Sequence, residues 1–159
     1  MSKLYKKILV ATDGSEHNEK AITHAIGLAK LTGAQLHAVY VISLVSPPGT
    51  LEIKANYDPE SYRTIDASIE GLKKILRHEG DEAIRYIEEM AKTEGLDVRK
   101  WIIEGQPAKE ILRLAEEQSV DLIVMGTLGR SGIEKFLLGS VADKVIRGSS
   151  IPVMVVRNN

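Results

Sequence analysis

Five short apolar runs alternate along the chain with segments of helical periodicity. The runs are ILVAT (Ile8 to Thr12), LHAVYVI (Leu36 to Ile42), VRKWII (Val98 to Ile103), DLIVM (Asp121 to Met125) and PVMVV (Pro152 to Val156). Near-continuous apolar strands such as ILV and LIVM are typical of a parallel sheet that is covered on both faces. The alternation therefore predicts an α/β fold, in which right-handed crossovers build a parallel sheet with helices on both faces.

Helices are predicted between these runs by apolar residues spaced i, i+3, i+4, i+7. The spacing occurs twice, at Ile22, Ala25, Ile26 and Ala29 and at Ala108, Ile111, Leu112 and Ala115. A longer helix is predicted from Leu72 to Ala91, running through Gly80 and stopping at Gly95. Sheets of this class bind ligands at the carboxyl ends of their strands, beside the switch in strand order, so we expect the site there.

Composition narrows the class of protein. The chain has 159 residues, 43% of them apolar, a net charge of -1 and no cysteine. These values predict one soluble domain over residues 1–159 without disulfides, thiolate metal sites or thiol catalysis. We expect no membrane partner, because no apolar run approaches the ~20 residues of a membrane span, and no nucleic acid partner, because there is no basic excess. The basic N-terminal segment indicates a strand start rather than a signal peptide, so a cytoplasmic protein is expected.

The segment from Ser43 to Ser68 does not fit the alternation. It is rich in Pro, Ser and turn residues and is too long for an ordinary connection of about 2–6 residues. We expect a flexible excursion on the ligand side of the sheet, because it leaves the carboxyl end of the second strand. Two interpretations stay open, a lid over the ligand and a solvated insertion with a short helix near Asp58 to Tyr62.

A glycine-rich stretch, GTLGRSGIEKFLLGS, begins at Gly126 and ends at Ser140. Gly126 ends the fourth strand, where a glycine permits a tight exit and close approach by a ligand. Gly129 and Gly132 leave backbone amides unshielded, and such amides can wrap phosphate oxygens. Gly139 and Ser140 come at a helix start, where free N–H groups and the helix dipole favour an anion. The stretch therefore predicts a cradle for a phosphate group.

Other glycine motifs do not fit. A Walker A loop needs a lysine after its last glycine, but Gly139 is followed by Ser140 and Val141. The spacing also differs from the GxGxxG of dinucleotide-binding folds and from the GxSxG of a nucleophile elbow. The spacing alone leaves a second interpretation open, in which the glycines only form turns and Ser140 only caps a helix.

The pattern Gly126-x2-Gly129-x9-Gly139-Ser140 matches the G-2x-G-9x-G-(S/T) pattern of the ATP-binding branch of the universal stress protein family. Three further segments resemble that family: KKILVATDGSE its first strand and turn, DLIVMGTLGRSG its fourth strand and loop, and IPVMVV its last strand. The resemblance covers essentially the whole chain and is weakest from Ser43 to Ser68.

The resemblance implies a fold similar to the adenine nucleotide alpha hydrolases, with five parallel strands in the order 3-2-1-4-5 and ATP at the carboxyl edge. It implies that Asp13 lies near the ribose and phosphates and helps to hold Mg²⁺. Val41 would meet the adenine through its backbone, with Met125 and Gly126 on the other side. The full implied nucleotide site consists of Thr12, Asp13, Val41, Met125, Gly126, Gly129, Arg130, Gly139, Ser140 and Val141.

Structural interpretations of the same residues stay open. The Asp13-Gly14-Ser15 sequence also suits a turn and helix cap that need no ligand. Val41 and Met125 are strand residues that any core can contain, and a lone loop arginine such as Arg130 is often solvated.

Catalysis has little support in the sequence. The histidines His17, His24, His37 and His78 form no metal-binding motif. Phosphoryl transfer needs a base or a water-positioning group and added positive charge, and nothing near the glycine loop supplies them. We expect at most slow ATP hydrolysis.

The sequence is therefore interpreted as an ATP-binding stress-response protein that acts as a nucleotide-dependent switch or sensor. The alternatives are a nucleotide-independent signalling or interaction module of the same fold, and a weak ATPase. A homodimer is also expected, because the last strand, Pro152 to Val156, is a short apolar edge of a kind that tends to be covered. The resemblance implies that the last strands of two subunits pair across a two-fold axis.

Overall fold

The computed structural model describes residues 3–44, 58–127 and 138–158 of the chain. Its parallel sheet has five strands in the order β3-β2-β1-β4-β5, as predicted. They are β1 (Lys7–Thr12), β2 (Gln35–Ile42), β3 (Val98–Glu104), β4 (Leu122–Gly126) and β5 (Val153–Val156). Each strand agrees with its predicted apolar run to within one residue at either end, which confirms the α/β class.

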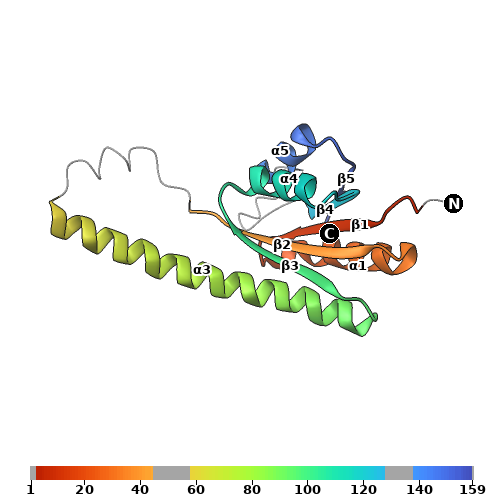
Figure 1. The fold of residues 1–159 in the computed structure, drawn as a ribbon, viewed down its shortest axis with the longest axis horizontal. Coiled ribbons are helices and arrows are strands. Elements are labelled where there is room, and N and C mark those ends of the chain that lie inside the picture. Colours follow the sequence, from red (N-terminus) through yellow and green to blue (C-terminus); the bar gives the residue numbers. More distant parts are fainter. Residues whose placement is uncertain (1–2, 45–57, 128–137, 159) are drawn as a thin grey trace.

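Helices cover both faces of the sheet (Figure 1). Helices α1 (Glu19–Thr32) and α3 (Pro59–Thr93) share one core with alternate strand residues such as Ile8 and Val10. Helices α4 (Pro107–Glu117) and α5 (Ser140–Gly148) share the other core with Leu9 and Ala11. A short 3-10 helix, η1 (Glu16–Asn18), precedes α1. Alternate side chains of β1 thus pack into two apolar layers, one on each face of the sheet. This is why the sequence of β1 is continuously apolar.

Helix α3 is longer than predicted, with 35 residues. It begins directly after Asp58, whose Oδ1 accepts the backbone N–H groups of Glu60 and Ser61 at 3.0 Å each. An Asp cap followed by proline is a strong helix start, so residues 59–68 belong to this helix. The expected excursion from Ser43 to Ser68 was wrong for residues 59–68, and the short helix that one interpretation placed near Asp58 to Tyr62 is the start of α3. Residues 45–57 lie outside the described residues.

The other end of α3 agrees with the prediction that Gly95 stops it. Gly95 has φ +74°, and the N–H of Leu96 donates to the carbonyl of Ala91 at 2.9 Å, which closes the helix end. The N-terminal part of α3 extends past the end of the sheet (Figure 1). No helix in the described ranges, α3 included, is long and apolar enough to cross a membrane.

Gly80 is the point at which α3 meets the sheet most closely. It is buried within the helix, and a Cβ placed on it would come within 2.7 Å of Cδ1 of Tyr40 on β2. Tyr40 is itself only 3% exposed, so its ring has little room to move. The glycine that interrupts the helical pattern is therefore required by packing against this ring.

His37 of β2 is buried on the face that α4 and α5 cover. Its ring stacks on Trp101 of β3, with ring centroids 6.2 Å apart. The indole N–H of Trp101 donates to Nδ1 of His37 at 3.2 Å, and Nε2 lies 3.1 Å from Oε1 of Gln35. Because indole is only a donor, this arrangement fixes the neutral ring with its proton on Nε2. Burial, and then the charges of Arg99 and Lys7, lower the pKa of His37 to about 4.

The Gly80 contact predicts opposite effects of the same substitution at two positions of α3. Gly80→Ala should destabilise the fold by about 1–2 kcal/mol, because overpacking against Tyr40 outweighs the better helix propensity of alanine. Gly71→Ala, at a position with open space around it, should stabilise the fold by about 0.5–1 kcal/mol. Urea unfolding of both variants checks this, and a stabilising Gly80→Ala would contradict the packing.

The buried His37 predicts a pH dependence of stability. Below the ordinary histidine pKa of about 6.5 the unfolded chain binds a proton that the folded protein does not, until the pH falls to about 4. The stabilisation is therefore complete above about pH 6.5 and is lost as the pH falls toward 4. His37→Gln should reduce the slope of unfolding free energy against pH in this window by up to about 1.4 kcal/mol per pH unit. Equal slopes for wild type and variant would refute the neutral buried state.

Candidate functional site

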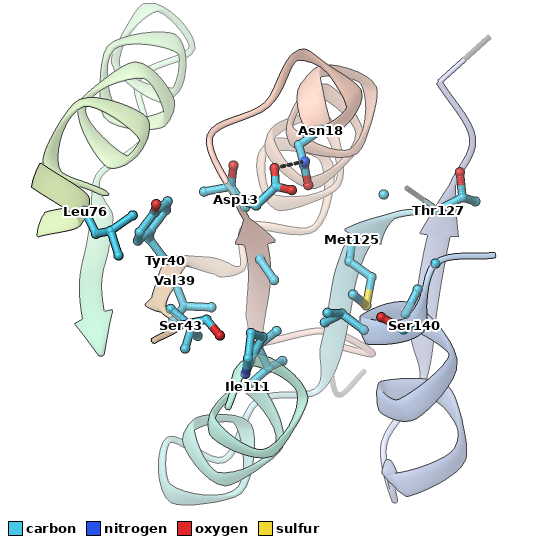
Figure 2. Close-up of a pocket in the computed structure, with 18 residues that line it drawn as sticks. Asp13, Asn18, Val39, Tyr40, Ser43, Leu76, Ile111, Met125, Thr127 and Ser140 are labelled. Atoms are coloured by element: carbon cyan, nitrogen blue, oxygen red, sulfur yellow. Dashed lines mark hydrogen bonds between the residues drawn. The ribbon is translucent and has the colours of Figure 1, made fainter. Parts of the chain in front are cut away.

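A pocket of about 340 Å³ opens at the carboxyl edge of the sheet. It lies where β1 and β4 are neighbours, with β2 and β3 on one side and β5 on the other. This is the switch point in strand order, so the pocket is where a doubly wound sheet is expected to bind its ligand. Helices α3, α4 and α5 also contribute to its wall (Figure 2).

The predicted site residues that the structure describes all line this one pocket. They are Thr12, Asp13, Val41, Met125, Gly126, Gly139, Ser140 and Val141. The remaining two, Gly129 and Arg130, lie outside the described residues. Segments more than a hundred residues apart in the chain are thus brought together by the sheet.

Asp13 is held by the turn that follows β1. Its Oδ1 accepts the backbone N–H of Ser15 at 2.9 Å and the side-chain amide of Asn18 at 2.7 Å (Figure 2). Asn18 is only 5% exposed and also donates to Oγ of Ser15 at 3.0 Å. Gly14, at φ +81°, permits the turn, and its N–H donates to Oγ1 of Thr12 at 3.1 Å. Asp13 therefore stabilises the turn and lines the pocket at the same time.

Helix α5 begins at the opposite wall. Gly139 is the residue that caps it, with φ -70° and ψ 160°, and Ser140 is the first helical residue. The interpretation of Ser140 as the cap is therefore wrong. Among the described residues no side chain caps α5, so the first amides of the helix, those of Ser140 and Val141, are presented at the pocket with the positive end of the helix dipole.

The glycine-rich stretch is tied together at its two ends. The N–H of Gly139 donates to the carbonyl of Thr127 at 2.6 Å, and the N–H of Thr127 lies 3.3 Å from the carbonyl of Val156 on β5. The chain therefore leaves β4 and returns to α5 at neighbouring points. Both points line the pocket, as expected for the rim of an anion site.

The end of the pocket away from α5 is apolar. Val39, Tyr40, Leu76 and Ile111 line it and are here called the apolar end (Figure 2). Three of them are core residues, with Val39 at 1% and both Tyr40 and Ile111 at 3% exposure. In Figure 2 Asp13 and Asn18 lie on the α1 side of the pocket, across from Ile111, at neither the Leu76 end nor the Ser140 end. The pocket therefore suits a ligand with a flat apolar part, an anionic end and polar groups on the side that faces Asp13.

The sequence analysis missed several lining residues, among them Asn18, Val39, Tyr40, Ser43, Leu76 and Ile111. Val39 could have been found, because it lies two residues before Val41 and so on the same face of β2. Leu76 could not, because its place depends on where α3 crosses the sheet, which the helical period alone does not tell.

Asp13 is the one carboxylate among the described residues that line the pocket. In the described part of the chain no group of three or more His, Cys, Asp or Glu side chains is placed to hold a metal ion. A divalent cation in this pocket would thus need ligand oxygens and water besides Asp13, which is the coordination that Mg²⁺ commonly has beside phosphates.

Comparison with known proteins was made on sequence and on structure. The model of the universal stress protein family matches residues 4–157. The universal stress protein MJ0531 of Methanocaldococcus jannaschii is 40% identical over 154 residues, which are 97% of this chain and 83% of that protein.

Two solved structures share the fold. The protein MJ0577 of the same organism superposes with a TM-score of 0.79 at 30% identity, covering 98% of each chain. A universal stress protein in complex with cAMP superposes with a TM-score of 0.66 at 26% identity, also covering 98% of each chain.

Proposed function

The chain belongs to the universal stress protein family, and we propose that it binds an adenine nucleotide, ATP in particular, in the pocket at the carboxyl edge of its sheet. The observation that carries this proposal is that the pocket has an apolar end and, opposite it, the N-terminus of α5. The complex of a related universal stress protein with cAMP supports it, since that ligand combines an adenine with a phosphate.

The phosphates would lie at the start of α5. The amides of Ser140 and Val141 would donate to phosphate oxygens, and the Ser140 hydroxyl would add a further donor. Gly126 and Gly139 leave room for this approach, and Gly129 and the backbone of Arg130 are proposed to complete the cradle. The phosphate end thus uses backbone dipoles rather than a lysine.

The nucleoside would occupy the rest of the pocket. Val41 and Met125 are proposed to flank the adenine, with the Val41 backbone in contact with the edge of the base. Asp13, which Asn18 holds in place, would accept hydrogen bonds from the ribose hydroxyls. Thr12 lines the pocket next to Asp13 and is only 8% exposed.

Mg²⁺ is proposed to accompany the phosphates, with Asp13 as its protein ligand. The fit rests on the donor set, because one carboxylate beside phosphate oxygens and water suits Mg²⁺. When bound, the ion would neutralise charge on the phosphates. The residues of this chain would orient the nucleotide around it.

The role proposed for the bound nucleotide is that of a switch or sensor in the stress response. The described lining residues include no His, Lys or Arg to serve as a base or to stabilise a transferring phosphate. Any hydrolysis should therefore be slow, and a weak ATPase remains the second candidate. A nucleotide-independent signalling module is favoured if wild type binds no nucleotide.

We further propose a cytoplasmic homodimer that pairs through β5, with no nucleic acid or membrane partner. β5 is an edge of the sheet, and most of its residues are half-buried in the single chain. Sedimentation at micromolar concentration should give twice the mass of the chain, and a monomeric mass would overturn this proposal.

The phosphate site predicts a difference between two substitutions of one residue. Proline fits the first position of a helix and follows the extended Gly139 well, so Ser140→Pro removes only one amide donor and the hydroxyl. Ser140→Ala keeps the amide and removes the hydroxyl alone. Calorimetric titration with ATP and Mg²⁺ should show roughly tenfold or greater loss of affinity for Ser140→Pro and a smaller loss for Ser140→Ala.

Two controls complete this titration. Thermal unfolding should show both variants as stable as wild type to within about 1 kcal/mol. Omitting Mg²⁺ should weaken ATP binding in wild type and change it little in Asp13→Asn. If wild type binds no adenine nucleotide while it stays folded, the proposed function is wrong.

A further inference from the structure

Helix α3 leaves the sheet at the wall of the pocket. Gly80 packs on the ring of Tyr40, and Leu76, one turn earlier, is half-buried and lines the apolar end. Beyond this turn the helix no longer lies on the sheet, and Leu72 and Ile75 are 46% and 58% exposed. Residues 59–75 are here called the projecting half of α3 (Figure 1). Leu76 is therefore the junction between the pocket and this half.

Two of the polar contacts between this junction and the sheet involve Glu104. Glu104, at the end of β3, lies 3.6 Å from Nζ of Lys73 and 3.5 Å from a guanidinium nitrogen of Arg77. These side chains are substantially exposed, and exposed ion pairs contribute little to stability. An additional contact at Leu76 would therefore help to set the position of the projecting half.

The side chain of Leu76 lies beside Tyr40 at the apolar end, whereas Ser140 lies at the far side of the pocket (Figure 2). A nucleotide with its phosphates on α5 would place its base toward this end. An aromatic base held between Val41 and Met125 would then extend toward this end and bury apolar surface against Leu76.

We propose that Leu76 contacts the base of the bound nucleotide and so couples occupancy of the pocket to the projecting half of α3. This inference rests on the proposed function and identifies α3 as the element that responds to the bound nucleotide. A ligand that touches α3 in only one of its positions favours that position. By reciprocity, the same contact contributes to nucleotide affinity.

Leu76→Ala tests the contact, with two matched variants beside it. Leu76→Ala should weaken ATP binding on the order of tenfold in calorimetry, because it removes apolar area from the base site. Leu76→Met keeps a side chain of similar volume and should lose less affinity than Leu76→Ala. Leu72→Ala changes the same residue type one turn away, at an exposed position outside the pocket lining, and should bind like wild type.

Hydrogen exchange tests the coupling in the same proteins. Saturating ATP should slow exchange of the amides at residues 63–75, within the projecting half, in wild type and in Leu72→Ala, and should slow it much less in Leu76→Ala. If Leu76→Ala binds ATP as tightly as wild type, or gains the same protection, the inference is wrong while the proposed function stands. If wild type itself does not bind ATP, both are wrong.

Discussion

Burial of the sheet on both faces is the constraint on which the rest of this structure depends. β1 and β4 carry apolar residues toward two separate helix layers, α1 and α3 on one face and α4 and α5 on the other. The right-handed connections on the two sides of the β1–β4 boundary therefore run in opposite directions along the sheet. The strand order reverses at that boundary, and the strand ends there line the pocket. The turn directly follows β1, and the N–H of Gly139, which donates to the carbonyl of Thr127, holds the start of α5 beside the end of β4.

The polarity of the pocket follows from the elements that border it. The α5 side offers helix amides with only a glycine as cap, and the α3 side offers Leu76 beside the core residues Val39 and Tyr40. Asp13, fixed by Asn18, lies on the α1 side of the pocket. An adenine nucleotide matches this arrangement of surfaces, and the cAMP complex of a related protein agrees with that match. The proposed switch role needs a mobile element in contact with the ligand, and α3 is well placed for it.

Much of this arrangement was predictable because it is local. Apolar runs located the five strands of the described sheet, and turn residues and the glycine pattern placed Asp13, Gly139 and Ser140 at the ends of these elements. The strand order came only from the family resemblance, because alternation of strands and helices does not decide which strands are neighbours. A short helix near Asp58 was one of two interpretations, but its continuation into α3 was missed, since the polar residues after it resemble a loop. Leu76 and the Gly80 contact with Tyr40 arise from tertiary packing, which no sequence period contains.

The most direct test of the account is a methyl NMR titration of the protein with ATP and Mg²⁺. The account predicts that the largest shifts fall on the methyl groups of Val39, Leu76, Ile111 and Met125, which line the pocket. Methyl groups of the buried core away from it, such as Ile8 and Ile87, should change little. Shifts confined to another surface, or none at saturating ATP, would contradict the assignment of this pocket as the nucleotide site.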